Sequence, residues 1–199
     1  LHQKTLNEVL LLKLACHAIS AGVGLGFNRV IFLMKSHSTY NNEVLRVTRA
    51  IGHLTYHEAR PDWENVRHTF RDLEALRLHV LENDGTNWVQ TPLAKALGAY
   101  EVPIMPNTIQ VVGAIEKNIV KVFNDGKPHW HKLTKPPRDR QPTTLTKALG
   151  LRREYILLPL IASDGTSLGV VYADYALIDK PITKEIITLA TTFVRQVAL

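Results

Sequence analysis

The order of the predicted elements favours an α+β fold, in which one sheet is built from two β-hairpins and helices occupy both ends of the chain. Three observations support this prediction. Apolar runs flank the turn residues Asp164 and Gly165, strand-like runs flank the polar segment 36–43, and apolar residues at both chain ends recur at helical spacing. A doubly wound fold would need strands and helices in regular alternation, which this order lacks.

The strongest strand signal is the segment 155–175, whose sequence is YILLPLIASDGTSLGVVYADY. Asp164 and Gly165 supply the positive-φ residues of a tight turn, and both flanks are rich in Ile, Leu, Val and Tyr. The segment therefore predicts a β-hairpin. Pro159 cannot donate a backbone hydrogen bond, so we expect a bulge or an unpaired side at that point.

The N-terminal part predicts a helix followed by a second hairpin. Apolar residues between Leu6 and Ile19 lie mostly at helical spacing, and Gly22 is a typical helix stop. The run 27–34 is apolar and β-prone, as expected of a strand buried on both faces. The run 44–51 alternates apolar and basic residues, which predicts a half-exposed second strand.

The middle of the chain gives weaker signals. In chain order, the remaining predicted elements are a helix over 55–82, a broken segment over 83–107, a short strand at 109–112, a helix at 114–123, a strand at 127–133, a short helix at 143–150 and a final helix from Pro181 to the end. Pro61 is tolerable in the first turn of its helix. Glycines and prolines break the segment 83–107, and long loops of this kind are often functional.

Length and composition predict a single soluble domain. The chain has 199 residues, 45% hydrophobic and 21% charged, and no apolar run approaches the roughly 18 to 20 residues that span a bilayer. We expect no membrane insertion, and no secretory leader is recognisable at the start. The single cysteine, Cys16, cannot form an intrachain disulfide, which favours a cytoplasmic location.

The net charge of +6 indicates affinity for anions, but the basic residues are scattered along the chain. The one dense cluster is the proline-rich segment 132–140, and no series of aromatic residues accompanies it. We therefore expect a solvated loop there and no nucleic-acid partner.

Several segments together resemble the GAF domain of bacterial signalling proteins. They are GLGFNRVIFLM at 24–34, the hairpin at 155–175 and PITKEIITLATTFVRQVAL at 181–199, in the order that this family shows. The segment 50–63, AIGHLTYHEARPDW, is similar to a pattern that follows the second strand in GAF domains attached to sensor kinases and related regulators. The resemblance covers most of the chain, with the middle aligned only by order.

The resemblance implies a central antiparallel sheet of five or six strands, with the terminal helices on one face and loops, short helices and a pocket on the other. It also implies one sensory domain over 1–199, with a core of about 20–180 and a helix at each end. Such domains pair through their first and last helices, so we expect a homodimer through 6–19 and 182–197. An effector domain such as a kinase, which this chain does not contain, would receive the signal.

Known ligands of the family can be tested against the residues. Phytochrome-like GAF domains attach a bilin through a cysteine in the middle of the domain, whereas Cys16 lies in the first predicted helix. We therefore expect no covalent bilin. The Asn-Lys-Phe-Asp-Glu motif of cyclic-nucleotide GAF domains is absent from the sequence. Methionine-sulfoxide reductases of this fold use several cysteines, which argues against that activity here.

The candidate ligand residues come mainly from the middle of the chain. His129 and His131 stand two apart on a predicted strand, which is compatible with a metal or haem, but no Asp, Glu or Cys stands at a recognisable metal spacing. We therefore expect no metal site and do not favour haem. Trp88 and Trp130 offer flat apolar surface in the region where the family binds ligands. Asp174 ends the last strand and either contacts a ligand or accepts backbone N–H groups.

No catalytic motif is present: the sequence has no G-x-S-x-G elbow, no H-E-x-x-H and no P-loop. We expect a non-catalytic, cytoplasmic sensory domain, part of a signalling system such as a two-component pathway, that binds a small molecule or relays a conformational change. The alternative is a protein-interaction or dimerisation module with no ligand, whose pocket is filled by its own side chains.

Overall fold

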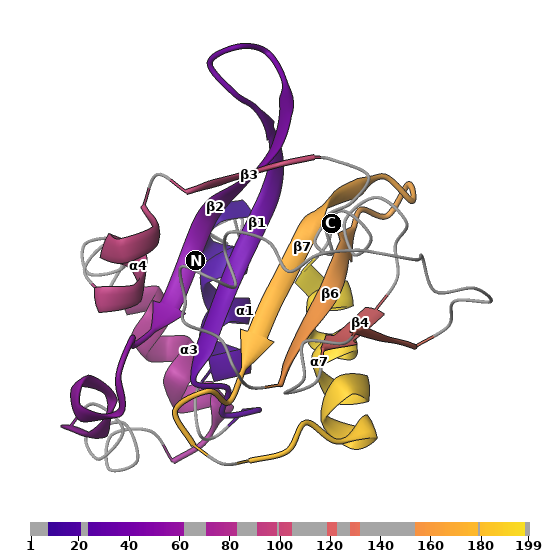
Figure 1. Ribbon diagram of the computed structural model, residues 1–199. Coiled ribbons are helices and arrows are strands. Elements are labelled where there is room, and N and C mark those ends of the chain that lie inside the picture. The colour runs from indigo at the N-terminus through magenta and orange to yellow at the C-terminus, as the bar shows by residue number, and fades with distance from the viewer. Residues whose placement is uncertain are drawn as a thin grey trace, which may run out of the picture.

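The computed structural model describes residues 8–20, 24–61, 71–82, 91–98, 100–104, 119–122, 128–131, 154–178 and 180–197. Over these residues the chain is an α+β layer structure (Figure 1). Helices α1 (Glu8–Ser20) and α7 (Lys184–Val197) pack on one face of a mixed-length antiparallel sheet, and α4 (Pro92–Leu97) packs on the other. This arrangement confirms the predicted fold class.

The sheet joins the two predicted hairpins side by side. Its strand order is β3 (Glu101–Pro103), β2 (Glu43–Gly52), β1 (Arg29–His37), β7 (Ser167–Asp174), β6 (Tyr155–Ile161), β4 (Ile119–Val122) and β5 (Pro128–His131). All neighbours pair antiparallel, and β1 pairs with β7 at the centre. The apolar runs from the two ends of the chain therefore form one layer, as predicted.

Over the described residues the sheet has seven strands, whereas five or six were expected. The three-residue edge strand β3 lies inside the segment that glycines and prolines interrupt, where no strand was predicted. The predicted helix over 114–123 is wrong at 119–122, which form β4 between β6 and β5. Three of these four residues are β-branched, so pairing with two strands overrides an approximate helical spacing. The segments 109–112 and 143–150 lie outside the described residues.

The continuous helix predicted over 55–82 is interrupted. Residues 56–61 are helical, residues 71–72 are bends, and α3 (Leu73–Glu82) begins after them. The backbone N–H of Ala75 donates to Asp72 Oδ1 over 2.8 Å, which is an N-cap and therefore marks the start of a new helix. The earlier helix starts with a capping box, because Glu58 N–H donates to Thr55 Oγ1 while Thr55 N–H donates to Glu58 Oε2. Both caps were readable in the sequence.

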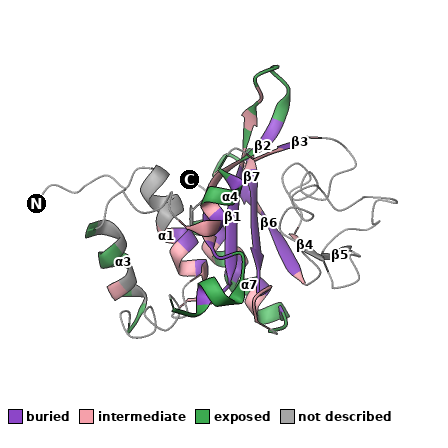
Figure 2. Ribbon diagram, turned by 60° about the vertical axis from the view of Figure 1, so that its left-hand side comes forward, coloured by how far each residue is buried: buried purple, intermediate pink, exposed green. Residues whose placement is uncertain are grey.

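The two faces of the sheet bury separate apolar clusters. The cluster under α1 and α7 contains Cys16 and Ile19 from α1, Ile187, Ala190 and Val194 from α7, and strand residues such as Phe32, Ile156 and Val171. The cluster under α4 contains Leu93 and Leu97 of that helix with Ile31, Leu33, Leu45, Leu157 and Val170 of the strands. The central strands are buried along most of their length, while the tip of the β1–β2 hairpin is exposed (Figure 2). Helix α3 packs on α1.

A β-bulge in β2 sets which of its side chains reach the α4 face. The register with β1 shifts between Phe32 and Leu33, and Thr48 Oγ1 donates to the carbonyl of Phe32 over 3.3 Å. The shift places Val47 and Ala50 together in the cluster under α4. At Pro159 a bulge or an unpaired side was expected. The register of β6 with β7 shifts between Leu160 and Ile161, one residue further on, and the described pairing of β6 with β4 reaches only Leu157.

Candidate functional site

Four polar side chains meet where β1 and β6 begin and β7 ends. In the register of the sheet, Asp174 lies opposite Arg29 of β1 on one side and opposite Tyr155 of β6 on the other. Tyr172 precedes Asp174 by two residues, so both point to the same face of β7. That face is the one covered by α4, because Tyr155 and Tyr172 belong to the cluster under this helix.

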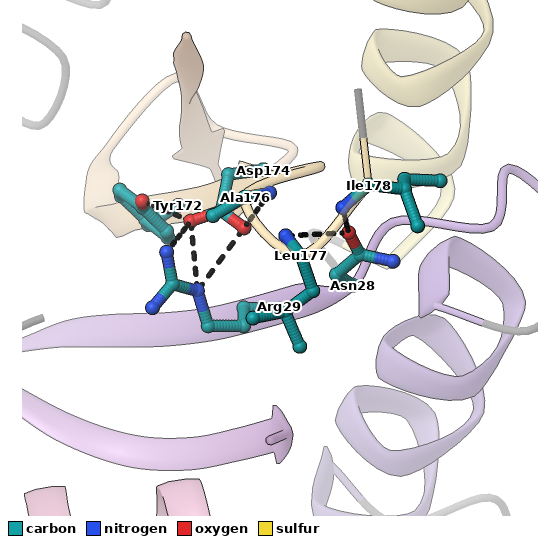
Figure 3. A network of polar contacts seen from close by, with 7 residues as sticks. All are labelled: Asn28, Arg29, Tyr172, Asp174, Ala176, Leu177 and Ile178. Atoms are coloured by element: carbon teal, nitrogen blue, oxygen red, sulfur yellow. Dashed lines mark hydrogen bonds and ion pairs between the residues drawn. The ribbon is translucent and has the colours of Figure 1, made fainter. Parts of the chain in front are cut away.

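Arg29 and Asp174 form a buried ion pair with fork-like geometry (Figure 3). The Nη2 of Arg29 lies 2.8 Å from Asp174 Oδ2, and its Nε lies 3.1 Å from Oδ1 and 3.0 Å from Oδ2. The side chains are 3% and 0% exposed. The hydroxyl of Tyr172 donates to Oδ2, and the backbone N–H of Ala176 donates to Oδ1 over 3.0 Å. Both carboxylate oxygens are thus satisfied by the protein itself.

Electrostatics in this cluster raise the pKa values of both Arg29 and Tyr172. Burial, the largest single influence, lowers the pKa of Arg29, but the nearby carboxylate of Asp174 and the hydroxyl of Tyr172 together raise it. Burial and then the charge of Asp174 raise the pKa of Tyr172 well above the ordinary value, with a smaller contribution from Tyr155. The network therefore contains a guanidinium cation that stays charged and a phenol that stays neutral.

The residue before Arg29 connects the network to the segment that leads into α7. Asn28 Oδ1 accepts the backbone N–H groups of Leu177 at 3.0 Å and Ile178 at 3.1 Å (Figure 3). Glu154, just before β6, holds the end of the same segment, because its Oε2 accepts the N–H of Ile182 over 3.1 Å. The connection from β7 to α7 is thus held by the residues that directly precede β1 and β6.

Gly52 leaves the room that Arg29 needs. Gly52 lies opposite Arg29 in the sheet and has a φ of 127°. A Cβ atom at this position would lie 2.2 Å from the carbonyl oxygen of Asn28 and 3.0 Å from the Cα of Arg29. Only glycine fits here, because the positive φ disfavours other residues and the neighbouring backbone leaves no space for a Cβ atom.

Tyr155 differs from Tyr172 and Tyr175 in the hydrogen bonding of its hydroxyl group. Its ring lies 5.1 Å from that of Tyr172, tilted by 31°, and the residue is 3% exposed. Within the described part of the chain, its hydroxyl has no hydrogen-bond partner. Burial raises its pKa, so the phenol stays protonated. By contrast, Tyr175 on the opposite face donates to the carbonyl of Leu25 over 2.6 Å and stacks on Phe27.

The arrangement of strands and helices can be compared with known proteins. No family model matches the chain, and no curated protein matches it. Among solved structures, it is similar to a methyl-accepting chemotaxis protein, residues 122 to 287, with a TM-score of 0.57 at 14% identity. That match covers 98% of this chain and 89% of the other.

A second match is the phycocyanobilin-bound GAF domain from a cyanobacterial phytochrome, with a TM-score of 0.50 at 13% identity over 98% of this chain and 93% of the other. A type II free methionine-R-sulfoxide reductase from Thermoplasma acidophilum matches with a TM-score of 0.48 at 11% identity, over 96% of this chain and 92% of the other. At these identities the likeness concerns the fold. The fold is GAF-like.

On the face under α4, the described side chains combine tyrosines with a buried ion pair. Among the described residues, no group of three His, Cys, Asp or Glu side chains is placed to hold a metal ion. The cluster offers a neutral phenol as hydrogen-bond donor and tyrosine rings as flat apolar surface.

The structure separates the residues singled out in the sequence. Asp174 lies at the centre of the cluster, where it both pairs with Arg29 and accepts the backbone N–H of Ala176. The second contact is the one expected of an acid at a strand end. His129, Trp130 and His131 lie in β5, which is separated from β7 by β6 and β4, and only their backbone is described. Trp88 lies outside the described residues.

Sequence reasoning missed the partners of Asp174. The predicted apolar strand at 27–34 includes Arg29, and the predicted hairpin at 155–175 includes Tyr155 and Tyr172, but neither pattern predicts that these side chains meet. The signal was a charged residue at the start of a run otherwise expected to be buried on both faces. A buried charge needs a counter-charge, and the acid that ends the other buried hairpin is the natural candidate. What the sequence did not supply is the strand order that places β1 beside β7.

Proposed function

We propose that this chain is a non-catalytic sensory domain that binds a small molecule on the face under α4 and relays the change through α7 to an attached effector domain. The observation that carries this proposal is the buried network of Arg29, Tyr172 and Asp174. It extends from the tyrosine rings on the α4 face to the segment that enters α7 on the other face.

The relay consists of a few short contacts. Tyr155 lies against Tyr172, Tyr172 donates to Asp174, and Asp174 accepts the N–H of Ala176. The neighbouring residue Asn28 holds the next two backbone N–H groups. A displacement of Tyr172 therefore moves a hydrogen-bond donor of Asp174 and loosens the connection to α7.

A buried charged network suits such a switch because partial rearrangement is costly. Taking a donor away from a fully buried carboxylate leaves an unsatisfied charge, so intermediate positions are disfavoured. A packed network of this kind has discrete arrangements rather than a continuous range. Ligand contacts on the tyrosine side would then select between two positions of the segment before α7.

We infer that two copies pair through α1 and α7. These helices contact each other on the same face of the sheet. On α7, Leu189 is 52% exposed and lies between the partly buried Ile186 and Phe193, at the spacing of one helical stripe. A second copy would cover this stripe. Among the described residues, no helix has the length and apolarity to cross a membrane, and the single cysteine supports a cytoplasmic location.

The position of the cysteine supports the non-catalytic reading. Cys16 is 0% exposed and belongs to α1, on the face of the sheet opposite Tyr155 and Tyr172. Burial raises the pKa of its thiol well above the ordinary value, which removes the thiolate that redox chemistry needs. A lone, inaccessible thiol cannot supply the several cysteines of a sulfoxide reductase.

A second candidate function is a dimerisation or interaction module without a ligand. The observation that favours it is burial, because Tyr172 is 0% and Tyr155 3% exposed. Native mass spectrometry of the purified protein, with and without incubation in cell extract, separates the two. A bound mass of a few hundred daltons supports sensing, and its absence supports the module.

Hydrogen exchange tests the relay. In Tyr172→Phe, we expect faster exchange of the N–H groups of 176–178 and of the first turn of α7 than in the wild type. Tyr100→Phe is the matched control, because Tyr100 packs in the same apolar cluster and, within the described residues, its hydroxyl has no partner to lose. Equal exchange in the α7 region of all three proteins would contradict the relay.

A further inference from the structure

We propose that the hydroxyl of Tyr155 is the polar anchor of the ligand site, and that the ligand is a flat, uncharged molecule that presents a hydrogen-bond acceptor to it. This inference rests on the proposed function, since it names the chemistry of the same site. It is carried by the buried hydroxyl itself and by what surrounds it.

The first observation is a hydrogen-bond deficit, which the buried hydroxyl of Tyr155 shares with that of Tyr100 beside the same cluster. Most buried side-chain polar atoms in proteins have a partner, and an unsatisfied one destabilises the fold. The hydroxyls of Tyr172 and Tyr175 have theirs, in Asp174 and in the carbonyl of Leu25. Tyr155 is 3% exposed and, among the described residues, has none. A phenylalanine would fill the same space without this cost, so the hydroxyl points to a partner from outside the chain.

The second observation is the character of the surface around this hydroxyl. Tyr155 and Tyr172 form a tilted pair of rings 5.1 Å apart. Apart from Tyr100, the other described members of the cluster are aliphatic, among them Leu157 and Val170 on the adjoining strand positions. Aromatic rings in such a setting favour planar partners through offset or edge contacts. A flat ligand therefore fits this part of the face better than a branched or extended one.

The third observation is charge neutrality. Arg29 and Asp174 are the buried side chains with a permanent charge among the described residues, and they pair with each other. Both oxygens of Asp174 already accept hydrogen bonds. A charged ligand would lose its hydration without gaining a counter-charge from this pair, which disfavours it strongly. The ligand is therefore neutral.

The fourth observation sets the direction of the hydrogen bond. Burial raises the pKa of Tyr155, so its phenol keeps its proton. A protonated phenol on an apolar surface donates, and a carbonyl oxygen or a ring nitrogen is the matching acceptor. The expected ligand class is thus an aromatic or conjugated ring that carries such an acceptor at its edge.

Three small probes of nearly equal shape test this chemistry: acetophenone, α-methylstyrene and benzoate. Acetophenone is neutral with an acceptor oxygen, α-methylstyrene lacks the acceptor, and benzoate carries a charge. Titrations followed by amide chemical shifts should show that acetophenone binds most tightly. In Tyr155→Phe, acetophenone should lose about five- to tenfold in affinity, the effect of one hydrogen bond, while α-methylstyrene stays unchanged.

Tyr175→Phe is the control, because this tyrosine is hydrogen-bonded on the opposite face and should leave the binding of all three probes unchanged. Three outcomes would overturn the proposal: equal binding of acetophenone to wild type and Tyr155→Phe, tightest binding of benzoate, or no binding of any probe. Equal binding of acetophenone to both proteins would mean that water, and not a ligand, is the hydrogen-bond partner of the Tyr155 hydroxyl. The relay is tested separately by the hydrogen exchange of Tyr172→Phe, so failure here is distinguishable from failure of the sensory function.

Discussion

The two faces of the sheet differ in how they use buried polar groups. The cluster under α1 and α7 is apolar apart from Cys16 and the hydroxyl of Tyr175, which reaches a backbone carbonyl. The opposite face, under α4, contains two tyrosines beside a buried ion pair. Both faces remove similar kinds of aliphatic surface from water. What distinguishes them is that, among the described residues, the second face contains a fully buried ion pair, in which each charge needs its partner.

This difference indicates that one face mainly stabilises the fold and the other mainly fixes the positions of its parts. An apolar helix-covered face stabilises the fold through burial, which tolerates exchanges between apolar side chains of similar volume. A buried ion pair adds little net stability over an apolar equivalent, but it penalises every arrangement except the paired one. The α4 face therefore specifies the position of the strand ends and of the segment before α7. The predictions below test this contrast, beginning with the largest expected effect.

The largest effect is expected from breaking the buried pair. Asp174→Ala leaves Arg29 buried without its counter-charge and should lower the free energy of unfolding by about 3–5 kcal/mol. Glu101→Ala is the control, because it breaks an ion pair with Arg46 whose side chains are 44% and 32% exposed. That change should cost about 0–1 kcal/mol. Urea unfolding followed by circular dichroism measures both.

If Asp174→Ala does not fold, Asp174→Asn keeps the shape of the side chain and removes its charge. A loss from either variant no greater than that of Glu101→Ala would erase the contrast between buried and exposed pairs.

The next effect concerns the space beside Arg29. Gly52→Ala should destabilise by about 3 kcal/mol, because it adds backbone strain at positive φ to a steric conflict with Asn28 and Arg29. Gly165→Ala is the matched control: this glycine has a φ of 84°, but a Cβ there would meet nothing within 4 Å. It should cost only about 1 kcal/mol from the backbone angle. Equal melting temperatures for the two variants would mean that Asn28 and Arg29 shift to accommodate the added Cβ atom at little cost in stability.

Removing hydroxyls from three buried tyrosines compares the faces directly. Tyr172→Phe removes a donor from a buried carboxylate and should cost about 1.5–3 kcal/mol. Tyr175→Phe removes a bond to a neutral carbonyl and should cost about 1 kcal/mol. Tyr155→Phe removes a group without a described partner, so the unfolding free energy should stay the same or rise. Denaturant titrations of the three variants should follow this order, and a reversal between Tyr172 and Tyr155 would refute it.

The smallest effect is a pH dependence on the helix-covered face. Burial raises the pKa of Tyr175 to about 12, from the ordinary 10.0 of a tyrosine side chain. The unfolded chain therefore ionises first, and the stability contributed by the neutral phenol is lost as pH rises from 10 towards 12. Unfolding free energies measured over this range should fall less steeply in Tyr175→Phe than in the wild type. Parallel pH curves would show that Tyr175 does not contribute.

The elements with strong local signals were predictable from the sequence. Both hairpins follow from turn residues between β-prone runs, and α1 and α7 follow from helical spacing. The errors lie in segments whose secondary structure depends on pairing with strands that are distant in the sequence. Residues 119–122 become β4 because β6 and β5 flank them, and β3 forms only at the edge of β2. The break before α3 is an exception, since Asp72 was a readable cap.

The candidate site was predictable only in part. Asp174 was recognisable as an acid at a strand end, and its contact with a backbone N–H follows from that position alone. Its pairing with Arg29 depends on the order of the strands, which local patterns do not determine. Tyr155 was identifiable as a strand residue, whereas the unpaired state of its hydroxyl is a property of the packed structure.

The ion pair at the centre of the sheet also constrains how the molecule folds. Arg29 and Asp174 are separated by 145 residues, so the contact has a very large sequence separation. During synthesis the arginine emerges long before its counter-ion and has to remain hydrated until the last hairpin is complete. Contacts of this range make folding slow, because the loop must close before the contact is gained. A shortened chain that ends before Asp174 would leave the first hairpin without its neighbour and its arginine without a partner.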